Sequence, residues 1–279
     1  MSNFGGRLLY RSPILGVRSI MLMLALSFTG TAAAQTPLNL DVPFVPTRTE
    51  VVSRMLDMAQ VGPSDFLIDL GSGDGRIPVA AVRDFGAKGA FGVDIDPDRV
   101  DEARASAQQE GVADKVRFEV QDLFKTDLSG ASVISMYLLP DVNLKLRSAI
   151  LGLAPGTRIV SHDFDMDDWE SDAHADVGRS RVYFWVVPAR VDGKWRVSGP
   201  DGEMTLDIAQ SFQKFDGRAM RDGRDMGPVS GRLRGSDLRF DVGEGADARR
   251  YAGRVQGDAM VAVAAAEPGF TQGWRARRQ

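Results

Sequence analysis

A short apolar run followed by an acid and alternating glycines constrains this chain more than any other stretch. Residues 66–68 (Phe-Leu-Ile) have the pattern of a strand buried on both faces, and residues 76–82 suit a helix. Between them stand Asp69, Gly71, Gly73 and Gly75. Such glycines allow positive φ and let the backbone approach a ligand without an intervening Cβ. Because a strand, a glycine-rich turn and a helix N-terminus form a ligand site at the edge of an open α/β sheet, the sequence predicts a doubly wound sheet organised around this turn.

The spacing of the glycines separates the cofactors that use such a turn. A dinucleotide site requires G-x-G-x-x-G, but Arg76 occupies the position of the third glycine, and the G-x-x-x-x-G-K-[ST] phosphate loop is absent. The pattern D-x-G-x-G-x-G resembles the first motif of the seven-strand S-adenosylmethionine-dependent methyltransferases. That resemblance implies a Rossmann-like seven-strand sheet and S-adenosyl-L-methionine as cofactor, with Asp69 helping to hold its ammonium or an ordered water. The alternative is that the glycines serve only a tight turn.

Acids at the ends of the next two expected strands extend this site. Residues 90–96 read as a second buried strand, and Asp94 can accept hydrogen bonds from both ribose hydroxyls of the cofactor. Asp96 suits the same role or that of an N-cap for the following helix. After a third strand at residues 116–120, the resemblance implies that Asp122 meets the adenine amino group and that Leu123 lies against the ring. The alternative for these two residues is a surface turn.

The segment before the first strand is expected to border the same crevice. Two prolines keep residues 43–47 extended, and Thr47 or Thr49 offers an N-cap to a helix with apolar residues from Val51 to Met58. A loop and a helix at this place would lie over the cofactor, so Thr47 joins the expected cofactor-binding residues. The alternative is a leading helix that only packs on the sheet.

The ends of the fourth and fifth strands supply the candidates for the reaction itself. The fourth strand, residues 131–136, leads into a loop from Tyr137 to Asn143 that lacks the [N/D]-P-P-[Y/F] arrangement used for planar amide or base nitrogens. The fifth strand reaches His162 and Asp163, which we expect to point to opposite faces because strand side chains alternate. A phenol and a carboxylate suit a flexible ammonium that must be bound and deprotonated. Tyr137, Asn143 and Asp163 are therefore the expected catalytic residues.

Several of these motifs together resemble one branch of the methyltransferase superfamily. They are the sequences Phe-Val-Pro-Thr at residues 44–47, the turn at residues 69–76, Tyr-Leu-Leu-Pro with Asn143, and Ser-His-Asp-Phe at residues 161–164. The branch is that of the protein-lysine methyltransferases similar to the mitochondrial ATP synthase c-subunit lysine methyltransferase and its bacterial relatives. The resemblance covers about residues 42–170. It implies methyl transfer from S-adenosylmethionine to the lysine amine of a protein substrate.

The N-terminal residues 1–34 have the pattern of a signal peptide. Three arginines precede an apolar run at residues 20–28, and three alanines precede Gln35. The apolar run is short for a membrane span, so we expect cleavage and no stable span afterwards. Export to the periplasm or the medium is the expected localisation, with a retained extension on a cytoplasmic protein as the alternative. Export conflicts with a cofactor that is made in the cytosol, and the sequence leaves both expectations standing.

Composition excludes some classes of site. The chain has 279 residues, a formal net charge of −4 and no cysteine. The charge gives no general reason to expect a nucleic-acid partner, and disulfides and thiolate metal sites are excluded. No metal site is expected.

The pattern changes near residue 181. Short alternating strands with glycine turns follow, which indicate a small antiparallel barrel or sandwich, and the first of them, residues 182–187, is expected to complete the methyltransferase sheet. The arginines of this part alternate with apolar residues, as on a solvated outer face or, alternatively, on a surface for an anionic partner. The expected divisions are a signal peptide at residues 1–34, a methyltransferase domain at 35–187 and a β-rich domain at 188–279.

Two other functions fit the same sequence. The first is an exported, non-catalytic binding protein that retains the methyltransferase fold as a scaffold, since fold does not fix function. The second is a methyltransferase that acts on a small molecule.

Overall fold

The computed structural model describes residues 45–200, 202–263 and 268–279. The expected signal peptide, residues 1–34, lies outside the described residues. Within the described ranges, no helix is both long and apolar enough to cross a membrane.

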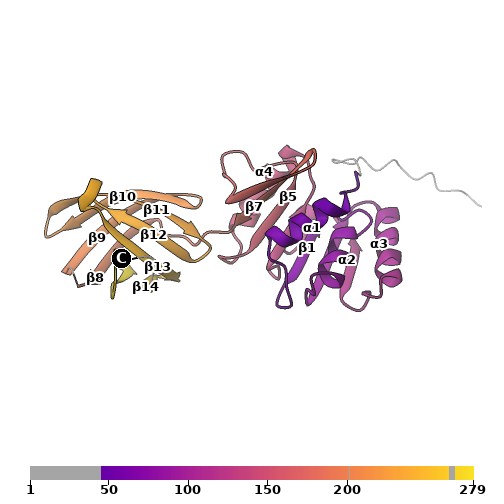
Figure 1. Ribbon diagram of the computed structural model, residues 1–279, viewed down its shortest axis with the longest axis horizontal. Helices are drawn as coiled ribbons and strands as arrows, with labels where there is room; N and C mark the ends of the chain where they lie inside the picture. Colours follow the sequence, from indigo (N-terminus) through magenta and orange to yellow (C-terminus); the bar gives the residue numbers. More distant parts are fainter. Residues whose placement is uncertain (1–44, 201, 264–267) are drawn as a thin grey trace, which may run out of the picture. The chain divides into compact units, whose positions relative to one another are not determined.

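The first sheet has seven strands in the order β3-β2-β1-β4-β5-β7-β6 (Figure 1). Strands β1 to β5 are parallel, whereas β7 runs antiparallel to both β5 and β6. This arrangement confirms the predicted Rossmann-like sheet and the prediction that residues 182–187 complete it. The strands are β1 (Phe66–Leu70), β2 (Gly89–Asp94), β3 (Val116–Val120), β4 (Val133–Met136), β5 (Arg158–His162), β6 (Ala173–Val177) and β7 (Ser180–Val186).

Successive residues of β1 pack on opposite faces of the sheet. Leu67 belongs to an apolar cluster that includes buried residues of α1, α2 and α3, whereas Ile68 belongs to a second cluster with buried residues of α4. Apolar side chains on both faces explain why the central strand is a nearly continuous apolar run. The helices are α1 (Thr49–Met58), α2 (Arg76–Arg83), α3 (Pro97–Gln109) and α4 (Pro140–Leu151).

The strand order determines where a ligand can bind. The chain proceeds from β1 to β2 and β3 on one side and then returns to place β4 on the other side of β1. Loops therefore diverge at the carboxyl ends of β1 and β4, which leaves a crevice at this topological switch point. Asp69 of β1 and Ser135 of β4 are register partners beside the crevice.

The helix starts agree only in part with the sequence predictions. The residue that caps α1 is Arg48, and it makes no side-chain capping bond, so the predicted cap at Thr47 or Thr49 is wrong. The Thr47 hydroxyl instead bonds His162, a residue far away in the sequence. Asp96 caps α3 by accepting a hydrogen bond of 2.9 Å from the backbone N–H of Asp98.

The second sheet closes on itself. Eight strands form a ring in the order β12-β11-β10-β9-β8-β16-β14-β13, and β13 pairs with β12 to complete it, while the short β15 adds to β13. Of the two predicted alternatives, a barrel or a sandwich, the structure therefore has the barrel. The strands are β8 (Gly193–Gly199), β9 (Gly202–Ser211), β10 (Lys214–Arg221), β11 (Arg224–Arg234), β12 (Asp237–Val242), β13 (Arg249–Gln256), β14 (Ala259–Ala262), β15 (Phe270–Thr271) and β16 (Arg275–Arg278).

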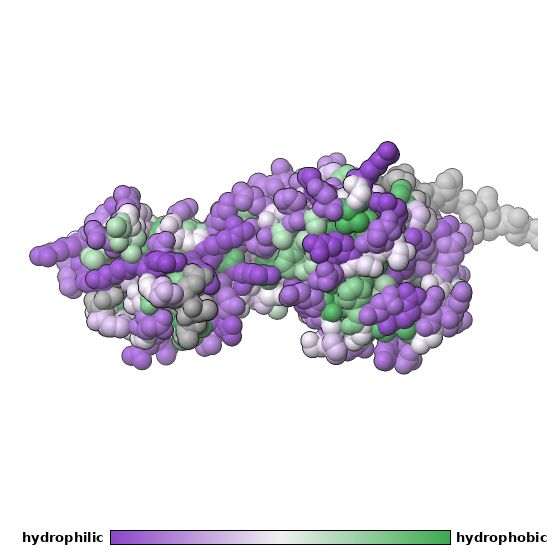
Figure 2. Space-filling view, in the orientation of Figure 1, coloured by the Kyte–Doolittle hydropathy of each residue, from purple (hydrophilic) through white to green (hydrophobic). Residues whose placement is uncertain are grey.

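Alternating side chains fill and cover this barrel. In β9, Leu206 and Ile208 are buried and Asp207 between them is exposed. An eight-stranded barrel has an interior just wide enough for side chains, and the buried cluster includes the large rings of Trp195, Phe240 and Trp274. Hydrophilic residues cover much of the barrel surface seen in Figure 2.

Gly75, the last glycine of the turn, allows the chain to pack closely against β3 and α3. Its φ is 79°, in the left-handed region. A Cβ atom at this position would lie 2.6 Å from the ring of Phe118 and 2.8 Å from the Cβ of Ala103. Both contacts are too short for carbon atoms. Packing and backbone conformation together therefore require glycine here.

We predict that Gly75→Ala lowers the free energy of unfolding by about 2–4 kcal/mol, because overpacking adds to the cost of a left-handed alanine. Gly111→Ala is the matched control, since Gly111 also has a positive φ, of 71°, but its added Cβ would meet no atom within 4 Å. The control should lose only about 1–2 kcal/mol. Urea denaturation of both variants measures the difference, and equal losses would exclude the packing contribution.

Candidate active site

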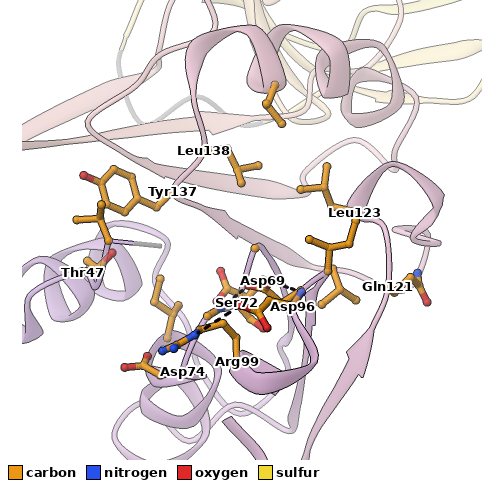
Figure 3. A pocket seen from close by; sticks show the side chains of 18 of the residues that line it. Thr47, Asp69, Ser72, Asp74, Asp96, Arg99, Gln121, Leu123, Tyr137 and Leu138 are labelled. Carbon is orange, nitrogen blue, oxygen red and sulfur yellow. Dashed lines mark hydrogen bonds and ion pairs between the residues drawn. The ribbon is translucent and has the colours of Figure 1, made fainter. Parts of the chain in front are cut away.

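A cleft opens at the switch point, bounded by the ends of β1, β2 and β4 and by the segment before α1. It contains about 1050 Å³ of space between protein atoms, including its open mouth. Figure 3 shows Thr47 and Tyr137 toward one end of the cleft and Gln121 and Leu123 toward the other. The sequence-predicted site residues that line the cleft are Thr47, Asp69, Gly71, Gly73, Asp94, Asp122, Leu123 and Tyr137. Gly75, Asn143 and Asp163 do not line it.

The glycine turn is tied to the neighbouring strand. The backbone N–H groups of Gly71 and Ser72 both donate to the carbonyl oxygen of Val93, each over 2.9 Å. A Cβ on Gly71, whose φ is 75°, would lie 2.9 Å from a methyl carbon of Leu138 in the facing wall. The Ser72 hydroxyl is buried at the cleft and has no hydrogen-bond partner in the described part of the chain. The turn therefore contains an unused polar atom in the wall of the cleft.

Asp94 is fixed at the end of β2 by two backbone groups. One carboxylate oxygen accepts from the N–H of Gly73 over 2.9 Å, and the other accepts from the N–H of Asp96 over 3.0 Å. Each carboxylate oxygen can accept a further hydrogen bond. The side chain is therefore oriented in advance for a ligand that carries adjacent hydroxyl groups.

Asp69 is almost fully buried at the base of the cleft, with a fractional exposure of 2%. Its carboxyl group accepts a hydrogen bond of 2.7 Å from the Ser135 hydroxyl. Burial raises the pKa of Asp69 to about 7, although the bond from Ser135 acts in the opposite direction, and the nearby charges of Asp94 and Asp74 raise it further. Burial disfavours the charged form of an acid, so a cation at this position would favour ionisation.

Thr47 reaches the cleft from the segment before α1 and is held at two atoms. Its hydroxyl lies 3.1 Å from Nδ1 of His162, and its carbonyl oxygen accepts a hydrogen bond of 2.7 Å from Arg76. The Arg76 guanidinium also bonds Asp74, and this pairing lowers the pKa of the Asp74 carboxyl against the effect of its burial. Sequence reasoning did not single out Ser72, Asp74 or Arg76, although all three lie within or directly after the glycine motif.

Large apolar side chains line the far end of the cleft, beside Gln121 and Asp122. Leu123 begins a short 3-10 helix, η1 (Leu123–Lys125), which Asp122 caps by accepting a hydrogen bond of 2.9 Å from the N–H of Phe124. Ile95 and Phe124 also line the cleft, and their fractional exposures of 44% and 43% are high for large apolar residues. A flat aromatic ligand would cover these side chains. Neither residue was predicted from the sequence, although Ile95 directly follows Asp94 and Phe124 directly follows Leu123.

Tyr137, His162 and Asp163 form a cluster at the ends of β4 and β5. The rings of Tyr137 and His162 are 3.9 Å apart, and one oxygen of Asp163 lies 3.3 Å from Nε2 of His162 and 3.5 Å from the Tyr137 hydroxyl. The expectation that His162 and Asp163 point to opposite faces is wrong. Asp163 has a φ of 61°, so the strand geometry ends at His162 and the next side chain turns back toward it.

The charges of this cluster follow from its burial. Burial lowers the pKa of His162, the charge of Arg48 lowers it further, and Asp163 acts in the opposite direction. Burial and the negative charge of Asp163 together raise the pKa of the Tyr137 hydroxyl. The phenol is therefore neutral at neutral pH, and the imidazole is favoured in its neutral form.

Asn143 lies beneath the cleft. Its side chain is fully buried, and its amide N–H groups donate to the carbonyl oxygens of Phe164 and Asp165 over 3.3 and 3.2 Å. These bonds hold the loop that follows Asp163. The geometry gives Asn143 a supporting place behind the cleft wall, because its side chain is not exposed to the cleft.

The cleft combines groups that suit one kind of ligand. It has an acid at its base, a prearranged carboxylate for adjacent hydroxyls, an unpartnered serine hydroxyl and an apolar end. These features fit a nucleoside that is joined to an amino acid. Among the described residues, no group of three or more histidines and acids is placed to hold a metal ion.

Comparison with known proteins agrees with this geometry. Residues 69–173 match the family described as the ANTKMT methyltransferase domain. The chain is 43% identical to a protein-lysine N-methyltransferase of Saccharolobus islandicus over 129 residues, which span 46% of this chain and 80% of that protein. It is 33% identical to the adenine nucleotide translocase lysine N-methyltransferase of Mus musculus, over 55% of this chain and 66% of that protein.

A solved structure is also similar. It is described as an RNA methyltransferase from Salinibacter ruber in complex with S-adenosyl-L-homocysteine. The sequence identity is 50%, the TM-score is 0.51, and the match covers 53% of this chain and 96% of that one. The cofactor product bound in that structure has the nucleoside and amino-acid parts that the cleft fits, which identifies S-adenosylmethionine as the cofactor. The chain belongs to the class I S-adenosylmethionine-dependent methyltransferases, in the family that includes the protein-lysine N-methyltransferase of Saccharolobus islandicus.

Proposed function

We propose that this methyltransferase transfers the methyl group of S-adenosylmethionine to the side-chain amine of a lysine in a protein substrate. The observation that carries this proposal is a phenol beside a carboxylate. Tyr137 lines one end of the cofactor cleft, and the carboxylate of Asp163, behind that lining, lies 3.5 Å from the Tyr137 hydroxyl. Two relatives that act on lysine in proteins, by their names, support the same acceptor.

Each part of the cofactor is assigned to a different group of residues in the cleft. S-adenosylmethionine supplies an electrophilic methyl group on a sulfonium centre. We assign its amino-acid part to Asp69 and Ser72, beside the glycine turn, and its ribose to Asp94. Asp122, Leu123 and Phe124 are assigned to the adenine. Gly75 supports the turn by packing, and Thr47 covers the amino-acid end.

The acceptor part requires removal of a proton. A lysine amine is protonated at neutral pH and must become neutral before its nitrogen can form the new bond to carbon as the carbon–sulfur bond breaks. Asp163 offers a negative charge that attracts the ammonium, and the ring of Tyr137 helps to exclude water. Desolvation then favours loss of the proton to the carboxylate or to solvent. Asn143 keeps the Asp163 loop in place.

A second acceptor class deserves a direct test. The similar structure from Salinibacter ruber is described as an RNA methyltransferase. The loop after β4 lacks the [N/D]-P-P-[Y/F] arrangement that suits a planar base nitrogen, and the chain carries a net charge of −4, so we favour the protein amine. The assay below separates protein, RNA and small-molecule acceptors, and it also separates an enzyme from a non-catalytic scaffold.

We predict that Tyr137→Phe and Asp163→Asn lower methyl transfer to protein lysine by at least tenfold and leave cofactor affinity within about threefold, because both groups act on the acceptor. Tritiated-methyl transfer into host extracts, followed by peptide mapping, measures the first quantity, and calorimetry measures the second. Tyr183→Phe, on β7 outside the cleft lining, is the matched control. Label on RNA or on a small metabolite, with none on lysine, would refute the acceptor and leave the methyltransferase assignment intact.

We predict that cofactor affinity rises between about pH 5.5 and 7, by at most about tenfold per pH unit. Below its pKa of about 7, Asp69 is mostly protonated in the free protein, so a cofactor that requires the carboxylate must displace a proton. Calorimetry in two buffers of different ionisation enthalpy measures the proton release. Asp69→Asn should remove both the slope and the release, whereas Asp122→Asn should keep them. A pH-independent affinity in the unmodified protein would contradict this assignment of Asp69.

We further propose that the protein is exported and that residues 1–34 are removed, on the support of the sequence pattern alone. The mature protein should then begin at or near Gln35. Mass spectrometry of protein purified from fractionated native cells measures this end. A cytosolic pool that retains Met1 would instead support the cytoplasmic alternative, in which the enzyme has direct access to its cofactor.

A further inference from the structure

The segment that covers the amino-acid end of the cleft is anchored to the fifth strand through one imidazole ring. Val45, Pro46 and Thr47 all line the cleft, and Thr47 is 4% exposed. The hydroxyl of Thr47 lies 3.1 Å from Nδ1 of His162, 115 residues away in the sequence. Its carbonyl oxygen has a separate donor, Arg76. The segment is thus anchored at two points. Arg76, next to the glycine turn, binds the carbonyl oxygen of Thr47, and His162, at the end of β5, binds its hydroxyl.

The two nitrogens of His162 contact different elements. Nε2 lies 2.9 Å from the hydroxyl of Ser180 on β7 and 3.3 Å from Asp163, while Thr47 is the hydrogen-bond partner of Nδ1. The ring face packs against Tyr137. If Nε2 carries the proton, it donates to Ser180 or Asp163, and Nδ1 accepts from Thr47, so every polar atom of this buried group has a partner. His162 does not line the cleft itself.

We propose that His162 is a positioning residue whose Nδ1 holds Thr47, and with it the Val45–Thr47 segment, in place over the bound cofactor. The proposal rests on the assignment of S-adenosylmethionine to this cleft and is independent of the acceptor. Loss of the bond would leave the Thr47 hydroxyl without a partner and free the segment on one side. Since Arg76 still holds the carbonyl oxygen, the expected loss of cofactor affinity is partial.

Two isosteric substitutions distinguish the nitrogens. The amide of asparagine can occupy the place of Nδ1, whereas the amide of the longer glutamine can occupy that of Nε2. We expect His162→Gln to weaken S-adenosylhomocysteine binding about fivefold, as for one neutral hydrogen bond, and His162→Asn to stay within about twofold of the unmodified protein. Calorimetry on the full chain measures both affinities. Turnover should fall in both variants, because each removes the ring that supports Tyr137. The two variants should therefore both have a lower kcat, but only His162→Gln should have a clearly lower affinity.

Substitution of the partners gives a second and independent measurement. Thr47→Val keeps the shape of the side chain and removes the hydroxyl, and it should weaken binding about as much as His162→Gln. Ser180→Ala removes the partner of Nε2 and should leave binding within about twofold. The double variant Thr47→Val/His162→Gln should be no weaker than either single variant, because both remove the same bond. If the His162 variants fail to fold, the comparison of Thr47→Val with Ser180→Ala still decides.

The outcomes are distinct. Equal losses in His162→Asn and His162→Gln, additive losses in the double variant, or an effect of Ser180→Ala as large as that of Thr47→Val would overturn the positioning role. Failure of the unmodified protein to bind S-adenosylhomocysteine would refute the cofactor assignment itself. Absence of labelled lysine with intact binding would refute only the proposed acceptor.

Discussion

A carboxyl group buried at the switch point is the constraint on which the rest of the site depends. Asp69 lies in the central strand with almost no exposure, and one hydroxyl, from Ser135 on β4, is its side-chain hydrogen-bond partner. A buried acid destabilises a fold unless it is paired or neutral, which explains its raised pKa. A cationic ligand would pair with the carboxylate and so offset the cost of burying it. The same residue therefore weakens the empty fold and favours the cofactor, because the strand order leaves its one open side facing the cleft.

The sheet brings together residues that the sequence keeps far apart. Thr47 precedes the first helix and His162 ends the fifth strand, yet they share a hydrogen bond because α1 packs on the face of the sheet next to β5 and β7. Tyr137 and Asp163 follow neighbouring parallel strands, so their side chains meet at one edge. The imidazole of His162 thus contacts Thr47 on the cofactor side and Tyr137 and Asp163 on the proposed acceptor side.

Features encoded within a few residues could be predicted from the sequence, and features set by tertiary contacts could not. The glycine spacing and Asp94 are local patterns, and both lie at the cleft. Gly75 belongs to the same pattern, but its place is decided by Phe118 and Ala103, which only the folded sheet brings near. The left-handed backbone of Asp163 broke the expected alternation. The choice between barrel and sandwich depended on a pairing between β12 and β13 that alternation alone does not specify.

The cleft is built from the N-terminal part of the described chain, and the barrel lies outside its lining. All of them fall between Val45 and Val142, and the family match ends at residue 173, before the barrel begins at Gly193. The barrel therefore contributes no wall to the cofactor site. Its interior is occupied by buried rings such as those of Trp195 and Phe240, so its chemistry must be sought on its outer face and loops.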